Sequence, residues 1–412
     1  MLARNVEEKI NRYLKLFPVV VLVGSRQSGK TTLAKMGREN WSYFDLENGS
    51  DFDFITHDFD FFFKQHPESI IIDEAQTSPT LFKELRGVVD ADRSRKGRFI
   101  LTGSSSPELH SNISESLAGR VGIVEIGTLK MNERYRKPLP AIYSILNTET
   151  PSKHLKAFST LPVVLHTDQV LHHFLKGGYP EPVVEDSEVF HEEWMVHYHK
   201  TYIQRDIRRL FPALNIENYR RFISMLSELS GTIINRSEIG RSLNVSESAI
   251  RDYLDIAQGT FMWRTLPSLE RTISKSVVKM SRGYLRDSGL LHHLVHVRKQ
   301  EQIYTRPSTG SAFEGFIIEE IIQGLRAVET APWSYNFYRT RGGAEVDLIL
   351  TAPNGVRIPV EIKFGASTRR AHLRSLKNFI EQEHCPYGIV INNADQITLL
   401  TENIIQIPAG CF

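Results

Sequence analysis

The sequence predicts an α/β protein built from successive parts, and three observations support this fold class. Apolar runs alternate with helix-compatible segments over residues 1–128, as in a parallel sheet covered by helices on both faces. A helix-turn-helix pattern follows at residues 235–254, and strand-like runs between two helical segments fill the last third of the chain. The expected boundaries are 1–128 for the sheet domain, 129–230 for a helical connector, 231–300 for a winged helix-turn-helix and 301–412 for a C-terminal α/β domain.

The composition is that of an ordinary globular protein of 412 residues, with 41% hydrophobic and 24% charged side chains. The formal net charge of +2 gives no overall field that would select nucleic acid or a membrane. The two cysteines, Cys385 and Cys411, fit a reducing compartment, and no signal peptide is expected. The apolar run Val19–Val23 is far shorter than the ~20 residues that span a bilayer. We therefore expect a cytoplasmic protein with no membrane partner.

The first sheet is expected to contain five strands. Their runs are Pro18–Val23, Trp41–Leu46, Ser69–Asp73, Arg98–Thr102 and Gly122–Ile126. Helices are expected between them, at Thr31–Arg38 and Pro79–Asp90 among others.

A glycine-rich segment, GSRQSGKT, joins the first strand to the first of these helices. Glycines allow the backbone to approach a polyphosphate, and the exposed N–H groups then hold the anion. The lysine would reach the β and γ oxygens, and the threonine hydroxyl would bind Mg²⁺. The alternative is a purely structural loop. The expected ATP-binding residues are Gly24, Ser25, Arg26, Gln27, Ser28, Gly29, Lys30, Thr31 and Thr32.

An acidic pair follows the strand Ser69–Asp73, about 40 residues after this loop. Ligands of such sheets bind at the carboxyl ends of the strands. Asp73 would hold Mg²⁺ and Glu74 would polarise the attacking water. Alone, an apolar run that ends in Asp-Glu would indicate only a turn.

Two further polar features complete this predicted site. Ser104 follows the strand Arg98–Thr102 and would contact the γ-phosphate or the water; the alternative is a Ser/Thr turn. Arg120, after Gly119, would act as an arginine finger in the same chain or from a neighbouring subunit, which would require a homo-oligomer. The alternative is a structural arginine that pairs with a carboxylate.

The middle part combines helical and basic segments. Residues 189–209 are predicted to be helical, with a basic end at Lys200, Arg205, Arg208 and Arg209. In the helix-turn-helix pattern, Ser237 is expected to cap the first helix and Ser246 the second. The second helix is not strongly basic, whereas six Lys and Arg residues occur from Arg264 to Arg286. That stretch predicts a wing that tracks DNA phosphates, or else a basic strand used in packing.

The last third contains a candidate metal site. A hairpin centred on residues 353–355 would place Asp347 beside Glu361, and Lys363 would share a strand face with Glu361. Two carboxylates can bind a divalent cation such as Mg²⁺ or Mn²⁺, and a lysine can position water.

These motifs together resemble a prokaryotic family of AAA-type ATPases whose C-terminal domain has no known function but a nuclease-like core. The resemblance rests on GSRQSGKT, IIIDEAQ, FILTGSSS and SLAGR, and on GGYPE (177–181), YIQRDI (202–207) and LRDSGL (285–290). The segment 126–133 departs from the family pattern there. The last third also resembles the PD-(D/E)xK, restriction-endonuclease-like core, in which Glu314 matches the acidic residue of the first helix. The alternative is a degenerate core kept for packing or docking.

Three functions remain open from the sequence. The first is a Mg²⁺-dependent ATP hydrolase coupled to DNA binding, with metal-dependent DNA cleavage by the C-terminal domain. The second is an ATP-driven switch that docks protein partners through a degenerate core. The third is a defence-like nuclease gated by ATP.

Overall fold

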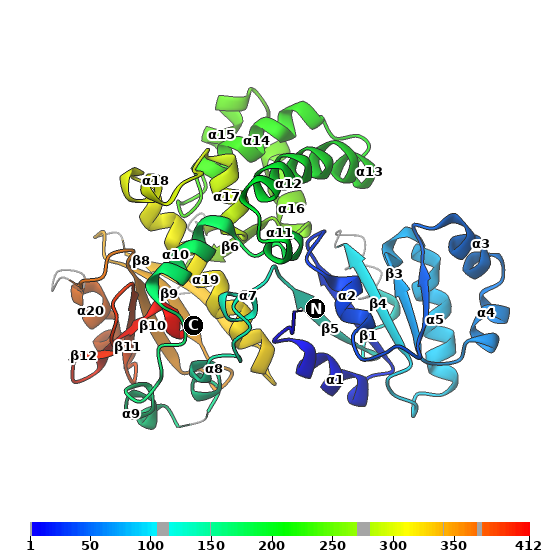
Figure 1. Cartoon of the computed structure of the whole chain (residues 1–412), viewed down its shortest axis with the longest axis horizontal. Helices are drawn as coiled ribbons and strands as arrows, with labels where there is room; N and C mark the ends of the chain where they lie inside the picture. Colours follow the sequence, from blue (N-terminus) through cyan, green and yellow to red (C-terminus); the bar gives the residue numbers. More distant parts are fainter. Residues whose placement is uncertain (1, 105–114, 149, 270–280, 341, 369–372) are drawn as a thin grey trace.

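The computed structural model describes residues 2–104, 115–148, 150–269, 281–340, 342–368 and 373–412, without the side chains of Ser104 and Ser152. Two sheets lie at opposite ends of the molecule, and a helical part lies above and between them (Figure 1). The 20-residue helix α19 (Thr309–Val328) passes between the two sheets and packs on elements of all parts. The α/β fold class predicted from the sequence is therefore confirmed.

The N-terminal sheet has five parallel strands in the order β2-β3-β4-β1-β5. The strand β1 lies between β4 and β5 and is buried along its whole length, which explains the unbroken apolar run in the sequence. The strands are β1 (Val19–Gly24), β2 (Ser42–Asp45), β3 (Ile70–Asp73), β4 (Phe99–Ser104) and β5 (Val121–Ile126). The helices are α1 (Glu7–Leu16), α2 (Lys30–Lys35), α3 (Gly49–His57), α4 (Phe59–Gln65) and α5 (Pro79–Ala91). All five expected strands are present.

A helical connector leads from β5 to the middle of the molecule. Its helices are α7 (Met131–Arg134), α8 (Ala141–Leu146), α9 (His154–Phe158), α10 (Thr167–Lys176), α11 (Pro180–Glu185) and α12 (Glu188–Thr201). One π-helical turn, η3 (Tyr202–Ile207), continues α12 into α13 (Arg208–Leu210). The expected helix over 189–209 is thus confirmed, with a π-turn at its basic end.

The helix-turn-helix pattern also folds as expected. Helices α14 (Ile216–Glu228), α15 (Arg236–Leu243) and α16 (Glu247–Gly259) precede an antiparallel hairpin of β6 (Trp263–Pro267) and β7 (Ser281–Leu285). Asn244 makes the left-handed turn, and the Ser246 hydroxyl accepts a hydrogen bond from the Ala249 amide at 3.1 Å. The cap of α15 was predicted wrongly. Asn235 accepts the bond from the Glu238 amide, because the helix starts earlier and Ser237 already lies in its first turn.

The C-terminal sheet has six strands in the order β12-β13-β11-β10-β9-β8. Strands β8 to β10 form an antiparallel meander that contains the expected hairpin, and β11 pairs in parallel with β10 after α20 (Leu373–Glu383). The strands are β8 (Ser334–Arg339), β9 (Glu345–Thr351), β10 (Arg357–Ile362), β11 (Gly388–Asn392), β12 (Thr398–Thr401) and β13 (Ile404–Pro408). The buried strand β13 was not anticipated. Helices α17 (Ser288–Leu294) and α18 (Gln300–Thr305) join β7 to α19.

Over the described ranges, no helix combines the length and the apolar character that crossing a membrane requires. Cys385 and Cys411 are both buried free thiols.

Candidate functional site

The glycine-rich loop connects β1 to α2, as the motif requires. Gly29 has a φ of 88° and Gln27 a φ of 62°, so the loop turns twice through the left-handed region. A Cβ on Gly24 would lie 2.1 Å from the Ile126 carbonyl oxygen, so only glycine fits where the loop passes the neighbouring strand.

The Lys30 side chain is folded back onto the loop. Its Nζ donates to the carbonyl oxygens of Gly24 and Ser25, at 3.2 and 2.9 Å, and the residue is 5% exposed. Burial lowers the pKa of Lys30, while Glu74 and Asp73 act in the opposite direction. An ammonium that has only carbonyl partners is poised to exchange them for an anion.

Asp73 and Thr31, 42 residues apart, meet at this loop. The Thr31 hydroxyl donates to Asp73 Oδ2 at 2.7 Å. The Tyr43 hydroxyl donates to the same oxygen at 2.9 Å, and the Thr102 hydroxyl donates to Oδ1. Burial, together with Asp73, raises the pKa of Tyr43, which stays a neutral donor. Tyr43 is the second residue of β2 and Thr102 the fourth residue of β4, and neither was predicted as a site residue.

Glu74 follows β3 in the left-handed conformation, with φ 52° and ψ 44°. This conformation is uncommon for a residue with a side chain and recurs at functional sites. Its amide donates to the Thr102 hydroxyl at 3.4 Å, and the Gln76 side-chain amide donates to its carboxylate. Glu74 is thus held at the same sheet edge as Lys30 and Asp73.

A pocket of about 360 Å³ opens beside the loop, between the first domain and helix α11. Its size is that of a small-molecule site. Its lining includes Thr32, Leu33, Met36, Leu129, Pro180 and Val184.

Arg4 joins the loop to the connector and was not anticipated. Its guanidinium donates to the Ser28 carbonyl at 2.8 Å, to the Gly127 carbonyl at 2.8 Å and to Glu133 at 3.1 Å. The segment 126–133, where the sequence departs from the family pattern, therefore forms a short turn and helix around Glu133.

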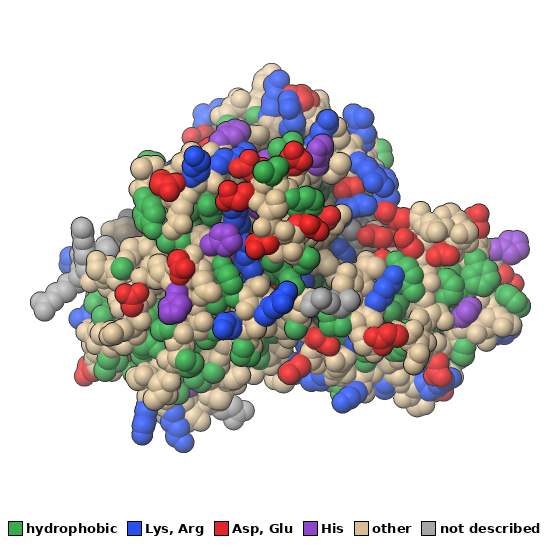
Figure 2. All heavy atoms as spheres, viewed as in Figure 1, with side chains coloured by type: hydrophobic (Ala, Val, Ile, Leu, Met, Phe, Trp, Pro, Cys, Tyr) green, Lys and Arg blue, Asp and Glu red, His purple; other side chains and the backbone are tan. Residues whose placement is uncertain are grey.

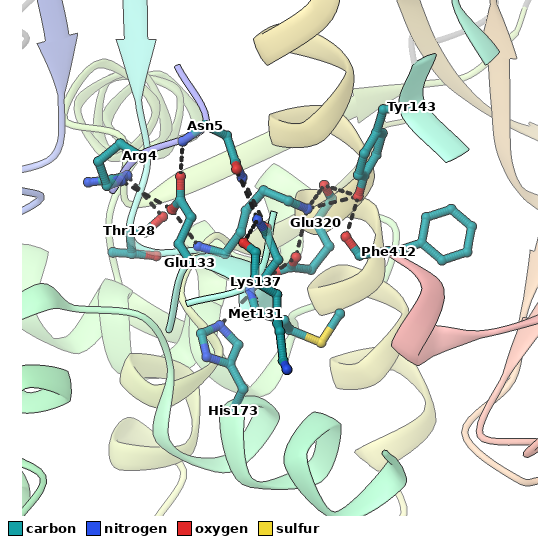
Figure 3. A network of polar contacts seen from close by, with 12 residues as sticks. Arg4, Asn5, Thr128, Met131, Glu133, Lys137, Tyr143, His173, Glu320 and Phe412 are labelled. Atoms are coloured by element: carbon teal, nitrogen blue, oxygen red, sulfur yellow. Dashed lines mark hydrogen bonds and ion pairs between the residues drawn. The ribbon is translucent and has the colours of Figure 1, made fainter. Parts of the chain in front are cut away.

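Figure 3 shows how this contact continues across the molecule. The Lys130 amide also donates to Glu133, at 2.9 Å. The Lys130 ammonium, almost completely buried, donates to Glu320 of α19 at 2.7 Å and to the Tyr143 hydroxyl at 2.8 Å. Tyr143 in turn donates to the carbonyl of Phe412, the last residue of the chain. Polar contacts thus run from the phosphate loop to the C-terminal domain.

Two predicted site residues are not brought to the loop within one chain. Arg120 lies at the opposite edge of the sheet, where its carbonyl pairs with Val19, and its guanidinium binds Asp90 at 2.7 and 2.8 Å. The prediction that Arg120 is an arginine finger for its own chain is therefore wrong, because the length of β1 separates Arg120 from the loop. The backbone of Ser104 pairs with Gly24, but its side chain and Ser105 lie outside the described residues.

Arg26 turns away from the loop toward the helical part. Its guanidinium donates to Asp206 at 2.7 Å and to Glu47 at 3.4 Å, and Arg209 pairs with Glu47 at 2.6 Å. Burial raises the pKa of Asp206, while Arg26 acts against it. The YIQRDI motif therefore contacts the phosphate loop directly.

The expected phosphate-tracking wing is contradicted for its described arginines. Arg264 and Arg286 point into the molecule and pair with Glu319 of α19 and Glu125 of β5. Burial would raise the pKa of Glu319, but the two guanidiniums lower it to about 2. The sequence could not distinguish this buried cluster from an exposed basic strand. Arg271, Lys275 and Lys279 lie outside the described residues.

The predicted C-terminal cluster does assemble. Asp347 of β9 accepts from the Ile362 amide at 2.9 Å and from Lys363 at 3.2 Å, and Lys363 lies 2.6 Å from Glu361. Glu314 of α19 accepts from the Tyr284 hydroxyl at 2.6 Å and pairs with Arg282 of β7 at 3.0 Å. Burial and the Asp347 charge raise the pKa of both Glu314 and Glu361.

These acids do not fit a divalent cation as they are arranged. Arg282 and Lys363 already serve as their counter-ions. Within the described part of the chain, no three His, Cys, Asp or Glu side chains are grouped so that they could hold a metal ion.

Comparisons with known families and proteins agree with a nucleotide-binding domain in the first part of the chain. Residues 16–135 match a family described as an AAA domain. Residues 167–301 and 309–412 match two domains of unknown function (DUF8612 and DUF4143). Uncharacterized proteins of Mycobacterium bovis and Mycobacterium tuberculosis are each 28% identical over 410 residues, which is 98% of this chain and 83% of theirs.

Similar solved structures are more remote. A Walker-type ATPase of Pyrococcus abyssi is 15% identical, with 72% of this chain and 96% of that chain covered and a TM-score of 0.40. The Holliday junction branch migration motor RuvB of Thermotoga maritima is 15% identical, with 64% and 89% covered and a TM-score of 0.31. These two likenesses are too remote to bear on function. The part of the chain that holds the phosphate loop, residues 16–135, is therefore similar to AAA-type ATPase domains in sequence, and its loop has the geometry of a P-loop.

Proposed function

We propose that this protein is a Mg²⁺-dependent ATP hydrolase whose cycle is coupled to binding of DNA. The observation that carries the hydrolase proposal is the meeting of Lys30, Thr31, Asp73 and Glu74 at one sheet edge, although they come from separate segments. A phosphate loop, a hydroxyl–carboxylate pair and a second carboxylate are the groups that phosphoryl transfer to water requires.

Each residue has a distinct role in this proposal. Lys30 leaves the carbonyls of Gly24 and Ser25 and binds the β- and γ-phosphates. Thr31 and Asp73 would hold Mg²⁺, which neutralises phosphate charge when bound. Glu74 accepts a hydrogen bond from the attacking water and orients it toward the γ-phosphate. The adenine base of ATP would lie in the pocket that Thr32, Met36 and Val184 help to line.

An arginine from a second copy would complete the site. Arg120 is bound to Asp90 and faces away from its own loop. It can therefore act only on the nucleotide of a neighbour, in a homo-oligomer.

The DNA proposal rests on a basic surface around α13. Lys200, Arg205 and Arg208 are exposed, and their side chains make no hydrogen bond or ion pair with any described residue. Figure 2 shows Lys and Arg side chains gathered near this end of the helical part. Unpaired guanidiniums on a helix end suit phosphate contacts, which would be sensitive to salt. Because the same turn binds Arg26 through Asp206, a nucleotide in the loop would alter this surface.

A second candidate, an ATP-driven protein switch, is favoured by a different face. The exposed side chains of α16 are Glu247, Ser248, Arg251, Asp252 and Asp255. This helix is acidic overall and would repel DNA phosphates. As a docking face it would suit a basic protein partner.

The test compares ATP hydrolysis with and without duplex and single-stranded DNA. We expect stimulation by DNA that disappears above physiological salt, and its loss in Arg205→Ala/Arg208→Ala without loss of basal hydrolysis. The control, Arg236→Ala/Arg241→Ala, removes the same charge from α15 and should keep the stimulation. Hydrolysis that ignores DNA at every salt concentration would contradict the coupling and favour the protein switch.

A further inference from the structure

We infer that Arg26 makes the phosphate loop selective for ATP over ADP, because Asp206 and Glu47 hold its guanidinium and the γ-phosphate competes with these carboxylates for it. This role rests on the proposed function, since Arg26 would act at the proposed ATP site. Lys30, Thr31, Asp73 and Glu74 suffice for the proposed hydrolysis, so Arg26 is a charged side chain of the loop that still lacks a role.

Arg26 lies in the part of the loop that Lys30 contacts. The Lys30 ammonium, which is assigned to the β- and γ-phosphates, donates to the carbonyl oxygens of Gly24 and Ser25, the two residues before Arg26. Arg26 and Lys30 are the two cations of the segment GSRQSGKT. Both are therefore placed to respond to the charge of a bound polyphosphate.

A cavity of about 20 Å³ extends from Arg26 toward the group assigned to the attacking water. Gly24, Arg26, Gln76 and Asp206 contribute to its lining. The Gln76 side-chain amide donates to the Glu74 carboxylate, which is assigned to that water. The Gln76 Oε1 atom is buried and has no hydrogen-bond partner among the described residues, so it can accept a bond from a guanidinium that turns toward the γ-phosphate.

The present partners of Arg26 are of a kind that a phosphate can replace. Its Nη1 atom donates to Asp206 at 2.7 Å, and its Nη2 atom lies 3.4 Å from a Glu47 oxygen. A guanidinium offers the same fork of donors to carboxylates and to phosphates. The γ-phosphate of ATP can therefore take Arg26 from both carboxylates, whereas ADP lacks that group and would leave Arg26 with Asp206.

Neither carboxylate is left without a cation when Arg26 moves. Glu47 also pairs with Arg209, at 2.6 Å. Burial raises the pKa of Asp206, and Arg26, Arg205 and Arg209 all act against this effect. Asp206 lies in the π-helical turn η3, and such turns inside α-helices are frequent at functional sites. The exchange of partners therefore leaves no buried charge without a counter-ion.

The test is equilibrium binding of fluorescent ADP, and of a fluorescent non-hydrolysable ATP analogue that keeps the γ-phosphate, to the full chain with Mg²⁺. Arg26→Gln should weaken binding of the analogue at least ~5-fold and leave ADP binding within about twofold of wild type. Asp206→Asn should strengthen binding of the analogue, and should bring no gain when it is combined with Arg26→Gln. Asp255→Asn is the matched control: it removes the same charge from the exposed face of α16 and should change neither affinity.

A second variant covers the case in which Asp206→Asn does not fold. Glu47→Gln removes the more distant partner of Arg26 and should strengthen binding of the analogue less than Asp206→Asn does. The inference is overturned if Arg26→Gln weakens binding of both nucleotides equally, or if neither folded carboxylate variant strengthens binding of the analogue. A wild-type chain that binds neither nucleotide would overturn the proposed function as well.

Discussion

At the scale of single residues, Lys30 and Glu74 separate binding from turnover. Lys30 is the buried cation of the loop, and its present partners are two carbonyl oxygens. The Glu74 amide donates to the Thr102 hydroxyl, and the Gln76 side-chain amide donates to the Glu74 carboxylate. Removal of the Lys30 ammonium should abolish phosphate binding, whereas neutralisation of the Glu74 carboxylate should leave phosphate binding intact.

We expect Lys30→Ala to lose ATP binding and Glu74→Gln to bind ATP normally but hydrolyse it at least ~100-fold more slowly, because a neutral amide cannot orient water as a carboxylate does. Nucleotide binding by fluorescence and phosphate release measure the two effects. Lys35→Ala, on the same helix but stacked on Tyr43, is the control and should leave binding intact. Wild-type turnover in both site variants would refute the hydrolase assignment.

Residues next to each other in sequence could be assigned from the sequence, whereas those joined by tertiary contacts could not. The loop and Asp73 were found because strand, glycine and acidic positions follow a fixed local order. Arg4 was missed because its partner Glu133 lies 129 residues away, and no local pattern marks that pair. For Arg120, a finger in its own chain, a finger in a neighbour and a structural pair with a carboxylate all stayed open, because the sequence does not say at which edge of a sheet a side chain lies.

At the scale of elements, two motifs of the middle part turn out to bind each other. The Asp287 carboxylate accepts from the Leu290 amide at the start of α17 and from the Gly178 amide, both at 2.9 Å. A Cβ on Gly178 would lie 2.1 Å from the Leu129 carbonyl oxygen, so the GGYPE turn packs without side-chain space against the connector. Both motifs are therefore explained by packing, without a direct role in chemistry.

Asp287→Ala should destabilise the protein by about 3 kcal/mol, since it removes a helix cap and leaves the buried Gly178 amide without an acceptor. Denaturation by urea measures the loss. Ser246→Ala removes the exposed cap of α16 and should cost only ~1 kcal/mol. Equal losses in the two variants would show that the Gly178 contact contributes nothing.

The sequence predicted the type and order of the elements better than the surroundings of their charged side chains. The order of helices and strands in the C-terminal domain followed from periodicity, and the β9–β10 hairpin placed Asp347 beside Glu361 as expected. For the basic stretch 264–286 the sequence left open a wing that tracks DNA phosphates and a strand used in packing, and its described arginines face buried acids of other elements, as the second alternative expects. A count of charges along a strand cannot reveal a partner on a distant helix.

At the scale of the whole molecule, one buried cluster ties the parts together. Glu125 comes from the first sheet, Arg264 and Arg286 from or beside the hairpin, and Glu319 from α19. Burial opposes the charge of Glu125, but Arg286, Arg326 and Arg264 hold its pKa well below the usual range. The cluster should stabilise the arrangement of the parts, and that stabilisation should depend on pH.

The direction of this dependence follows from Glu319, whose pKa falls from 4.5 to about 2 on folding. A depressed carboxyl pKa stabilises the folded state above the unfolded pKa, and this contribution is lost as the pH falls through 4.5 toward 2. The carboxylate should contribute about 3 kcal/mol at pH 7 and about half as much at pH 3. Glu319→Gln should therefore lower the urea midpoint of unfolding most at pH 7. The difference in urea midpoint between the variant and wild type should be about half as large at pH 3. Glu228→Gln, whose carboxylate pairs with Arg306 at the surface, should change the midpoint little at either pH. If the difference in urea midpoint between Glu319→Gln and wild type stays constant between pH 7 and pH 3, the cluster stabilises the arrangement of the parts through packing and not through charge.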